Sequence, residues 1–167
     1  MSEKIKIMME KCRPDAVIPR YANDGDAGMD IYAAEDVYAA PGMTVLVPTG
    51  IKMAIPYGYE VQIRPRSGIS LKTLLRVPNA PGTIDCGYRD EVNVIIYNAS
   101  TREDASVDAP FTLSDKGNKN GTYLIRKGDR IAQMVVAKVE YCEPVTVDSV
   151  ADIGSNRGGG FGSTGTC

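Results

Sequence analysis

The sequence contains no histidine. This absence excludes Ser-His-Asp and Cys-His nucleophile systems, zinc sites built on a His-Glu-x-x-His helix, and the zinc deaminase signature, which includes a histidine. Any catalysis must therefore depend on carboxylates, arginines, hydroxyls, backbone amides or an added metal ion.

The four cysteines form no Cys-x-x-Cys pair, which argues against a zinc site. The sequence opens with no secretory signal pattern, and no apolar run approaches the roughly 18 residues that a membrane span requires. We therefore expect no membrane association and free thiols in a reduced compartment. That compartment is the cytoplasm, or the host cytoplasm if the source is viral.

No excess of positive charge is present, because 19 Lys and Arg stand against 21 Asp and Glu, for a formal net charge of −2. The sequence therefore provides no basic field for a nucleic-acid partner, although a few arginines can still bind a small anion. Hydrophobic residues at 43% and charged residues at 24% are typical of a globular protein. A length of 167 residues suffices for one domain with a substantial core.

Seventeen glycines and ten prolines indicate many turns and argue against long helices. Apolar and polar residues alternate over 59–64 and over 92–97, which is typical of strands with one buried face. Strands are also predicted over 43–47 and 51–55, with a hairpin-like break between them.

Residues 130–141 are long enough for a helix but rich in β-branched side chains, which favours a strand. One short helix is predicted from Ser67 to about residue 76, with Ser67 as its N-cap. Short strands separated by frequent turns predict an all-β barrel or jelly roll with one short helix.

The domain is predicted to comprise residues 1–153. Within it, residues from about 101 to 121 are polar and rich in turn formers, so we expect a surface insertion there. Residues 154–167 are rich in glycine and serine and have almost nothing to bury. They are predicted to form a flexible arm.

Five short clusters carry residues suited to chemistry: 26–30, 65–68, 82–88, 128–133 and 157–165. In the second cluster, Arg66, Ser67 and Gly68 follow a strand and open the predicted helix. A guanidinium, a hydroxyl and free amides meet there, which suits either a plain N-cap or a phosphate site.

Asp85 lies in an apolar frame close to glycines. An aspartate in such a place is commonly a turn former. In a protein without histidine it is also the leading candidate for the general base that activates a water molecule. Tyr88, three residues on, is either a core residue or a flat wall beside a ring.

The glycine-rich end lacks the lysine of a P-loop, so that type of phosphate cradle is excluded. It is either a plain terminus or a flexible lid. In a lid, Arg157, Ser163 and Thr164 can meet phosphates, and Phe161 can stack on a base.

Three aspartates in the first and fourth clusters are turn formers when taken singly. Together with a polyphosphate, Asp26, Asp30 and Asp129 can hold a magnesium ion through water, because this ion prefers oxygen ligands and keeps much of its hydration.

In this order the five clusters closely resemble the five motifs of the trimeric dUTPase family, over nearly the whole sequence. The resemblance implies that the chain hydrolyses dUTP to dUMP and pyrophosphate, with Mg²⁺, by attack of water on the α-phosphorus. It implies an all-β fold, a distorted jelly roll or β-clip barrel, in a homotrimer that exchanges C-terminal arms and builds each active site from neighbouring subunits. Such an enzyme limits uracil incorporation into DNA and supplies dUMP for thymidylate synthesis.

The same resemblance implies a role for individual residues. Asp85 orients the attacking water, and Tyr88 packs against the deoxyribose, where a ribose hydroxyl would clash. Asn79 belongs to the uracil-binding hairpin, which leaves no room for the methyl group of thymine. The substrate-binding set is Arg66, Ser67, Gly68, Asn79, Gly82, Thr83, Ile84, Tyr88, Gln133, Arg157, Phe161, Gly162, Ser163 and Thr164.

Two further residues receive roles outside that set. Asp30 is associated with the water shell of the metal ion, and Arg130 is its structural partner. In the arm, Arg157 reaches the γ-phosphate and Phe161 lies over the uracil.

The sequence departs from the family pattern at four places. Asp90 replaces a usual glycine, Thr73-Leu74 replaces a commoner His-Gly pair, the arm is one residue shorter between Arg157 and Phe161, and the 101–121 segment is longer. We expect the turn at Asp90 to survive, because aspartate tolerates turn geometries. We expect the Thr73-Leu74 pair to alter the end of the short helix.

Two alternatives remain open from the sequence. A dCTP deaminase-like enzyme shares the fold but needs a glutamate at the base, whereas the Gly-Thr-Ile-Asp pattern at 82–85 favours attack of water on phosphorus. A non-enzymatic β-barrel module that merely retains the pocket is the other alternative.

Overall fold

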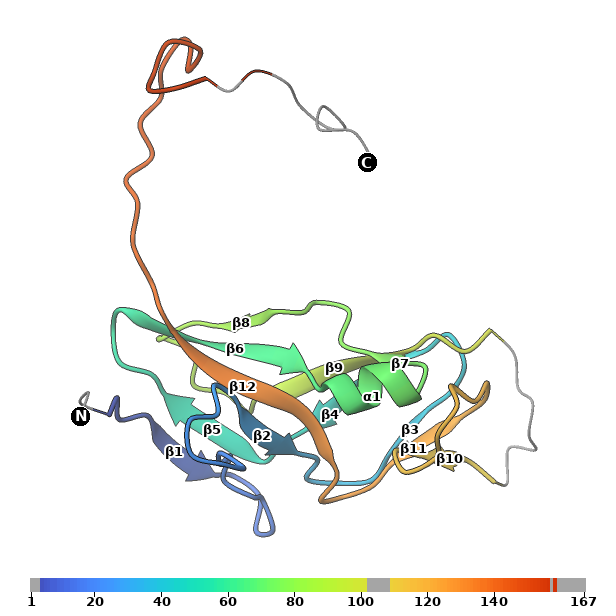
Figure 1. Ribbon diagram of the computed structural model, residues 1–167. Coiled ribbons are helices and arrows are strands. Elements are labelled where there is room, and N and C mark those ends of the chain that lie inside the picture. The colour runs from blue at the N-terminus through green and yellow to red at the C-terminus, as the bar shows by residue number, and fades with distance from the viewer. Residues whose placement is uncertain (1–3, 102–108, 157, 159–167) are drawn as a thin grey trace.

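The computed structural model describes residues 4–101, 109–156 and 158, which form twelve β-strands and one short helix (Figure 1). The elements in chain order are β1 (Met8–Lys11), β2 (Met29–Tyr32), β3 (Val37–Ala39), β4 (Thr44–Pro48), β5 (Ile51–Ala54), β6 (Tyr59–Pro65), α1 (Ser67–Lys72), β7 (Leu75–Arg76), β8 (Gly82–Ile84), β9 (Asn93–Asn98), β10 (Phe111–Thr112), β11 (Tyr123–Ile125) and β12 (Arg130–Lys138).

The strands form four small sheets, ordered β2-β12-β6-β8, β4-β9-β7, β10-β11-β3 and β1-β5. Pairing is antiparallel except between β10 and β11. Most paired strands are far apart in sequence, so the chain repeatedly crosses between sheets, as in jelly-roll folds. The predicted all-β fold of the jelly-roll class with one short helix is confirmed.

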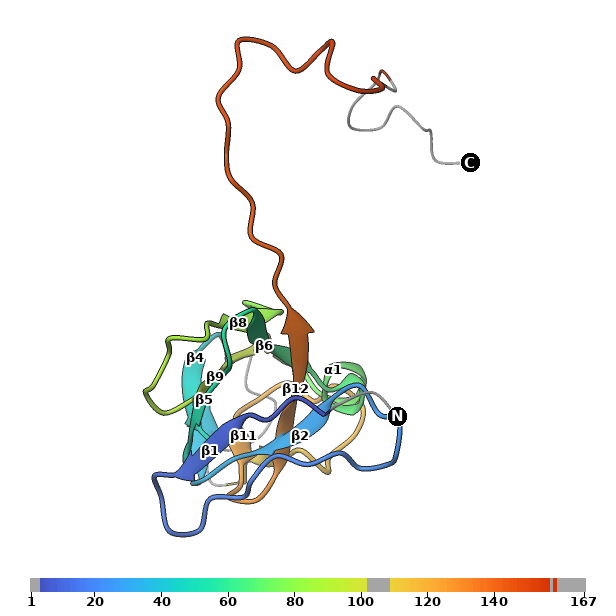
Figure 2. The ribbon, with the colours of Figure 1, turned by 90° about the vertical axis from the view of Figure 1, so that its left-hand side faces the viewer.

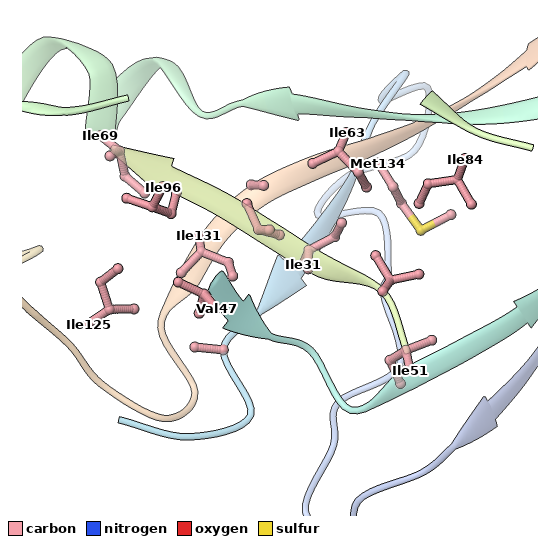
Figure 3. Packing of buried hydrophobic residues seen from close by; sticks show 14 of the residues in the cluster. Ile31, Val47, Ile51, Ile63, Ile69, Ile84, Ile96, Ile125, Ile131 and Met134 are labelled. Carbon is pink, nitrogen blue, oxygen red and sulfur yellow. The ribbon is translucent and has the colours of Figure 1, made fainter. Parts of the chain in front are cut away.

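The core lies between the sheets, where side chains from β2, β4, β6, β9 and β12 point toward one another (Figure 3). The alternation in the sequence explains this burial. Val61 and Ile63 of β6 and Val94 and Ile96 of β9 are at most 5% exposed. Each such side chain contributes about 1.5–3 kcal/mol when fully buried.

The predicted hairpin-like break at residues 48–50 is wrong, because β4 pairs with β9 and β5 pairs with β1. The Thr49 hydroxyl donates to the Val92 carbonyl oxygen at 2.7 Å, so the break is bonded to another segment instead of closing a hairpin. Gly50 has a φ of +69°, and a Cβ there would lie 2.5 Å from the Cβ of Ala16. The chain therefore changes sheet at a position that requires glycine.

The predicted helix forms but is shorter and begins differently. Arg66 is the N-cap, without a side-chain capping bond, so the prediction of Ser67 as N-cap is wrong. The helix ends before Thr73, whose backbone is extended. The Thr73 hydroxyl donates to the Ile69 carbonyl oxygen at 2.8 Å and accepts the Leu75 N–H at 3.1 Å. These side-chain bonds replace the next helical turn and start β7.

The polar segment at 101–121 is closed at its base by buried hydrogen bonds. Asn98 Nδ2 donates to the Gly121 carbonyl oxygen at 2.8 Å, and the Gly121 N–H donates to Ser100 Oγ at 3.1 Å. Inside the segment, β10 pairs with β11, and the Phe111 ring lies 5.8 Å from the ring of Tyr123. Residues 102–108 lie outside the described residues.

After β12 the chain leaves the barrel and extends away from it (Figures 1 and 2). At the point of departure, the ring of Tyr141 stacks on that of Tyr57, with centroids 5.1 Å apart. Several apolar side chains beyond this point are exposed, namely Val145, Val147, Val150 and Ile153. Among the described residues, no helix has the length and apolar character needed to span a membrane.

Candidate active site

A pocket of about 190 Å³ opens beside β8. Its lining combines residues that the sequence predicts at the site with residues of the core strands and of the segment before β9. The lining residues are Ile63, Asn79, Gly82, Thr83, Ile84, Asp85, Tyr88, Val92, Asn93 and Ile95. Six of the predicted site residues therefore meet in one cavity.

The strand β8 sets the direction of Asp85. It pairs with β6 so that Ile84 lies opposite Val61 and Thr83 opposite Gln62. Ile84 is buried, whereas Thr83 and Asp85 are exposed. The Tyr88 N–H donates to the Asp85 carbonyl oxygen at 3.1 Å and closes a turn. Asp85 is therefore the first residue after a strand held by a ladder.

The space around Asn79 depends on the glycine that begins β8, three residues further along the chain. A Cβ on Gly82 would lie 3.0 Å from Asn79 Nδ2 and 3.5 Å from the Cβ of Ile63. Glycine therefore lets the side-chain amide of Asn79 approach the backbone of β8. An amide beside backbone that lines a pocket is suited to the hydrogen-bonding edge of a base.

The Tyr88 ring is held at both ends. Its backbone N–H bonds to Asp85, and its hydroxyl donates to the Glu91 carbonyl oxygen at 3.0 Å. The residue is 39% exposed, so the ring borders the pocket instead of filling the core. Asp90 has no positive φ, so the backbone at this departure from the family pattern does not require glycine.

A second cluster lies where β2, β12 and the end of β6 meet. The Asp30 side chain is 6% exposed, and Arg130 Nη1 donates to its Oδ2 at 3.2 Å. Arg66 Nε lies 3.0 Å from Asp30 Oδ1 without hydrogen-bond geometry, so this contact is an ion pair. Two guanidiniums around one carboxylate leave an excess positive charge, which suits an anion.

Gln133 belongs to this second cluster through the register of its strand. It lies opposite Asp30 on β2 and opposite Arg64 on β6. A Cβ on Gly28 would lie 3.3 Å from the Cβ of Gln133, so glycine makes room for this side chain. Ser67 and Gly68 are exposed at the start of α1.

The predicted site residues thus fall into two groups within one chain. Arg66, Ser67, Gly68 and Gln133 are absent from the lining of the β8 pocket. The predicted arm residues, Arg157, Phe161, Gly162, Ser163 and Thr164, lie outside the described residues.

The three aspartates considered for a metal differ in their surroundings. Asp26 accepts the Asn23 N–H and Asp129 accepts the Arg126 N–H, both at 2.8 Å, so these two carboxylates stabilise their own turns. Within the described part of the chain, no group of three or more metal-ligating side chains comes together. A magnesium ion at this site would therefore take its ligands from phosphate and water, and Asp30, which is already paired with Arg66 and Arg130, would reach it only through a water molecule.

Glu91, which supports the pocket from outside its lining, is a residue that the sequence did not indicate. Its Oε1 accepts Arg13 Nε at 2.7 Å and the Gly50 N–H at 2.7 Å. The hydrogen bond from Arg13 lowers the pKa of the Glu91 carboxyl below its usual value, and the Gly50 N–H adds to this effect. No local sequence pattern connects residues 13 and 91, so no signal was available to find the pair.

Comparison with known proteins identifies the family. The family model of the dUTPases matches residues 15–109. The chain belongs to the dUTPase family. It is 44% identical to a deoxyuridine 5'-triphosphate nucleotidohydrolase of Solibacter usitatus, over 99% of both chains. A relative of the same name from Neorickettsia sennetsu is 41% identical, again over 99% of both chains. The predicted family and enzyme class are confirmed.

Solved dUTPase structures share this fold. A mutant dUTPase of Staphylococcus bacteriophage 80alpha, with dUpNHpp, superimposes with a TM-score of 0.85 at 29% identity, over 96% of this chain and 99% of the other. A mutant dUTPase from phage phi11 of S. aureus gives 0.78 at 28% identity, over 87% of this chain and 99% of the other. That structure is described as showing the coordination of a structural Mg(II) ion.

Proposed function

We propose that this dUTPase hydrolyses dUTP to dUMP and pyrophosphate by directing a water molecule at the α-phosphorus. The observation that carries the proposal is the pocket beside β8, which joins Asn79, Gly82, Thr83, Asp85 and Tyr88. This pocket supplies a base-binding amide, a sugar-facing ring and a carboxylate within one cavity.

Asp85 is the group that orients the water and accepts its proton. It follows the last residue of β8 and lies on the same face as Thr83, so the strand ladder fixes its direction. In a chain without histidine, a carboxylate at the pocket rim is the natural general base. Holding the water in line with the scissile bond supplies the entropic part of the acceleration.

Specificity for deoxyuridine comes from the two walls of the pocket. Asn79 presents its amide beside the backbone of β8, where it can bond to the polar edge of uracil. The Tyr88 ring, held by its hydroxyl and its backbone, closes the side that faces the sugar. A 2'-hydroxyl would have to displace a ring whose own hydroxyl is bonded to the Glu91 carbonyl oxygen.

The cluster of Asp30, Arg66 and Arg130 suits the triphosphate. Its excess positive charge offsets the repulsion between anionic oxygens and the attacking water. The hydroxyl of Ser67, the amide of Gly68 and the side chain of Gln133 add polar contacts. When bound, Mg²⁺ neutralises phosphate charge, and Asp30 would contact it through its water shell.

A homotrimer with shared sites explains why the two groups of residues are separate in one chain. The phosphate-binding residues of one subunit, around Asp30, Arg66 and Arg130, would meet the β8 pocket of a second subunit. An arm from a third subunit would close over both. The exposed apolar residues after β12 support this arrangement, since they gain burial when an arm lies on a neighbour. In this proposal the domain of residues 1–153 includes the extended segment after β12, and residues 154–167 form the closing arm, which carries Arg157 and Phe161.

In the cell, the proposed reaction limits uracil incorporation into DNA and provides dUMP for thymidylate synthesis. The proposal is tested by incubating the protein and Mg²⁺ with dUTP, dCTP, dTTP and UTP separately, with products resolved by chromatography. We expect pyrophosphate and dUMP from dUTP. Deamination of dCTP would favour the deaminase alternative, and binding of dUTP without turnover would favour the binding module.

A further inference from the structure

We propose that Glu91 is a positioning residue that fixes the Tyr88 ring and thereby sets the discrimination between deoxyribose and ribose. Its carboxylate is anchored outside the pocket by Arg13, while its carbonyl oxygen holds the wall of the pocket. This inference rests on the proposed function, in which Tyr88 faces the sugar.

The carboxylate end of Glu91 is bound to two segments far away in the chain. Arg13 donates through Nε to Oε1 at 2.7 Å and through Nη2 to Oε2 at 3.1 Å, which makes a two-bond fork. The Gly50 N–H donates to Oε1 at 2.7 Å. The Glu91 side chain is 21% exposed, so solvent screens the pair less than a fully exposed one.

The carbonyl end of the same residue bonds to side chains of the pocket wall. It accepts the Tyr88 hydroxyl at 3.0 Å and the Asn93 side-chain amide at 3.0 Å. Tyr88 and Asn93 both line the pocket. One residue therefore transmits the anchorage by Arg13 to two side chains that face the nucleotide.

The loop before Glu91 depends on this anchor. Downstream, the Val92 N–H donates to the Ile51 carbonyl oxygen, and the Val92 carbonyl oxygen accepts the N–H and the hydroxyl of Thr49. Upstream, the side-chain bonds of Arg89 are local, because they reach the carbonyl oxygens of Cys86 and Tyr88 within the same turn. The Val92 N–H belongs to the same peptide unit as the Glu91 carbonyl oxygen, so the Glu91 carboxylate is a second tie that holds this end of the turn to the barrel beside the bond to Ile51.

Loss of the anchor is expected to affect sugar selection more than water activation. Asp85 follows directly after the β8 ladder and keeps its direction when the far end of the turn moves. Tyr88 lies at that far end and depends on the Glu91 carbonyl oxygen. A ring free to shift admits the 2'-hydroxyl of ribose, so UTP becomes a better substrate relative to dUTP.

The test compares kcat/KM for dUTP and for UTP in the full-length protein and three variants. Glu91→Gln and Arg13→Met each weaken the fork. Glu35→Gln is the matched control, because it removes the other carboxylate that Arg13 contacts, at 2.8 Å, and leaves the Glu91 contacts in place. We expect the dUTP-to-UTP ratio to fall about tenfold in the first two variants, with kcat for dUTP nearly unchanged, and to stay within about twofold in the control.

A double-variant comparison, in which the Tyr88 hydroxyl and the Glu91 carboxylate are removed singly and together, distinguishes positioning from a general loss of structure. Tyr88→Phe removes the hydroxyl and is expected to lower the ratio by a similar factor, and the double variant Tyr88→Phe/Glu91→Gln is expected to lose no more than either single variant. Additive losses, or an unchanged ratio in Glu91→Gln and Arg13→Met, would overturn the inference. If Glu91→Gln fails to fold, Arg13→Met and Tyr88→Phe decide it by the same ratio. A wild-type protein that does not hydrolyse dUTP would instead overturn the proposed function.

Discussion

Asp85 illustrates how a single residue gains its role from its neighbours. The strand before it and the turn after it are both hydrogen-bonded, so its carboxylate is presented at the pocket rim without a partner residue having to guide it. In the proposed mechanism, this placement lets the carboxylate activate water by position, and its value as a base comes from geometry.

Replacement of this carboxylate by an amide tests that role. Asp85→Asn keeps the size of the side chain but removes the proton acceptor, so we expect turnover of dUTP to fall about 100-fold or more. Binding of dUTP is expected to remain close to that of the wild type, as measured by calorimetry with the inactive variant. Unchanged turnover would remove Asp85 from the mechanism.

Gly82 permits a second single-residue prediction. In Gly82→Ala the new Cβ would lie 3.0 Å from Asn79 Nδ2, so the amide must shift away from the base. We expect KM for dUTP to rise severalfold with little change in the thermal midpoint. Gly87→Ala is the matched control in the next turn, because a Cβ there meets nothing within 4 Å. A similar rise in KM in both variants would contradict the proposed place of Asn79.

At the scale of elements, side-chain hydrogen bonds decide where strands and helices end. The Thr73 hydroxyl closes α1 and opens β7, although Leu74 and Leu75 would have continued an apolar helical stripe. Periodicity in the sequence favoured the longer helix because it does not register a competing buried hydroxyl.

Thr73→Val tests this boundary with little change in shape. The Leu75 N–H loses its acceptor, the hydroxyl of Thr73, which is 0% exposed. We therefore expect the free energy of unfolding to fall by about 1–3 kcal/mol. Thr73→Ser, which retains the hydroxyl, is expected to lose less. Urea unfolding of the two variants and the wild type measures both losses of stability. Equal losses in the two variants would show that the hydroxyl has no part in the boundary.

The Glu91 anchor joins the segment at Arg13, the corner at Gly50 and the start of β9, and its charge gives it a pH dependence. The pKa of the Glu91 carboxyl is lower in the folded protein than in the unfolded chain, chiefly through the Arg13 hydrogen bond. Its contribution to stability is therefore present above the unfolded pKa and is lost as pH falls through the folded value.

We therefore expect Glu91→Gln to be less stable than the wild type at neutral pH, with the difference shrinking below about pH 4.5, the usual value for a glutamate. Thermal midpoints of both proteins across the acid range measure this difference. A difference in thermal midpoint that stays constant down to the lowest pH at which both proteins fold would show that the charged Glu91 carboxylate does not stabilise this contact.

At the scale of the whole molecule, the sequence predicted features formed by residues close together in the chain and missed contacts between residues far apart in it. The pocket residues from 79 to 88 are nearly contiguous, so their motif could be found directly. The strands at 59–64 and 92–97 followed from alternation. The pairing of β4 with β9, of β5 with β1, and of Arg13 with Glu91 joins segments far apart in the chain, and periodicity carries no information about such partners.

The separation of the β8 pocket from the Asp30 cluster makes the active site a property of the assembly in this account. An arm that extends from the barrel with exposed apolar residues has the form of a segment donated to another copy (Figures 1 and 2). Exchange of identical elements between subunits provides such an assembly with little cost to the barrel itself.

The most direct test is complementation between two inactive variants. One subunit carries Asp85→Asn with an intact arm, and the other keeps Asp85 but ends after Asn156. The two are co-expressed with different tags and purified through both. If arms are donated between subunits, mixed assemblies regain dUTP hydrolysis, because some sites combine a native Asp85 with an intact arm from a neighbour. Each variant alone must first be shown to fold and assemble. Mixed assemblies that are then no more active than either variant alone would contradict the shared site.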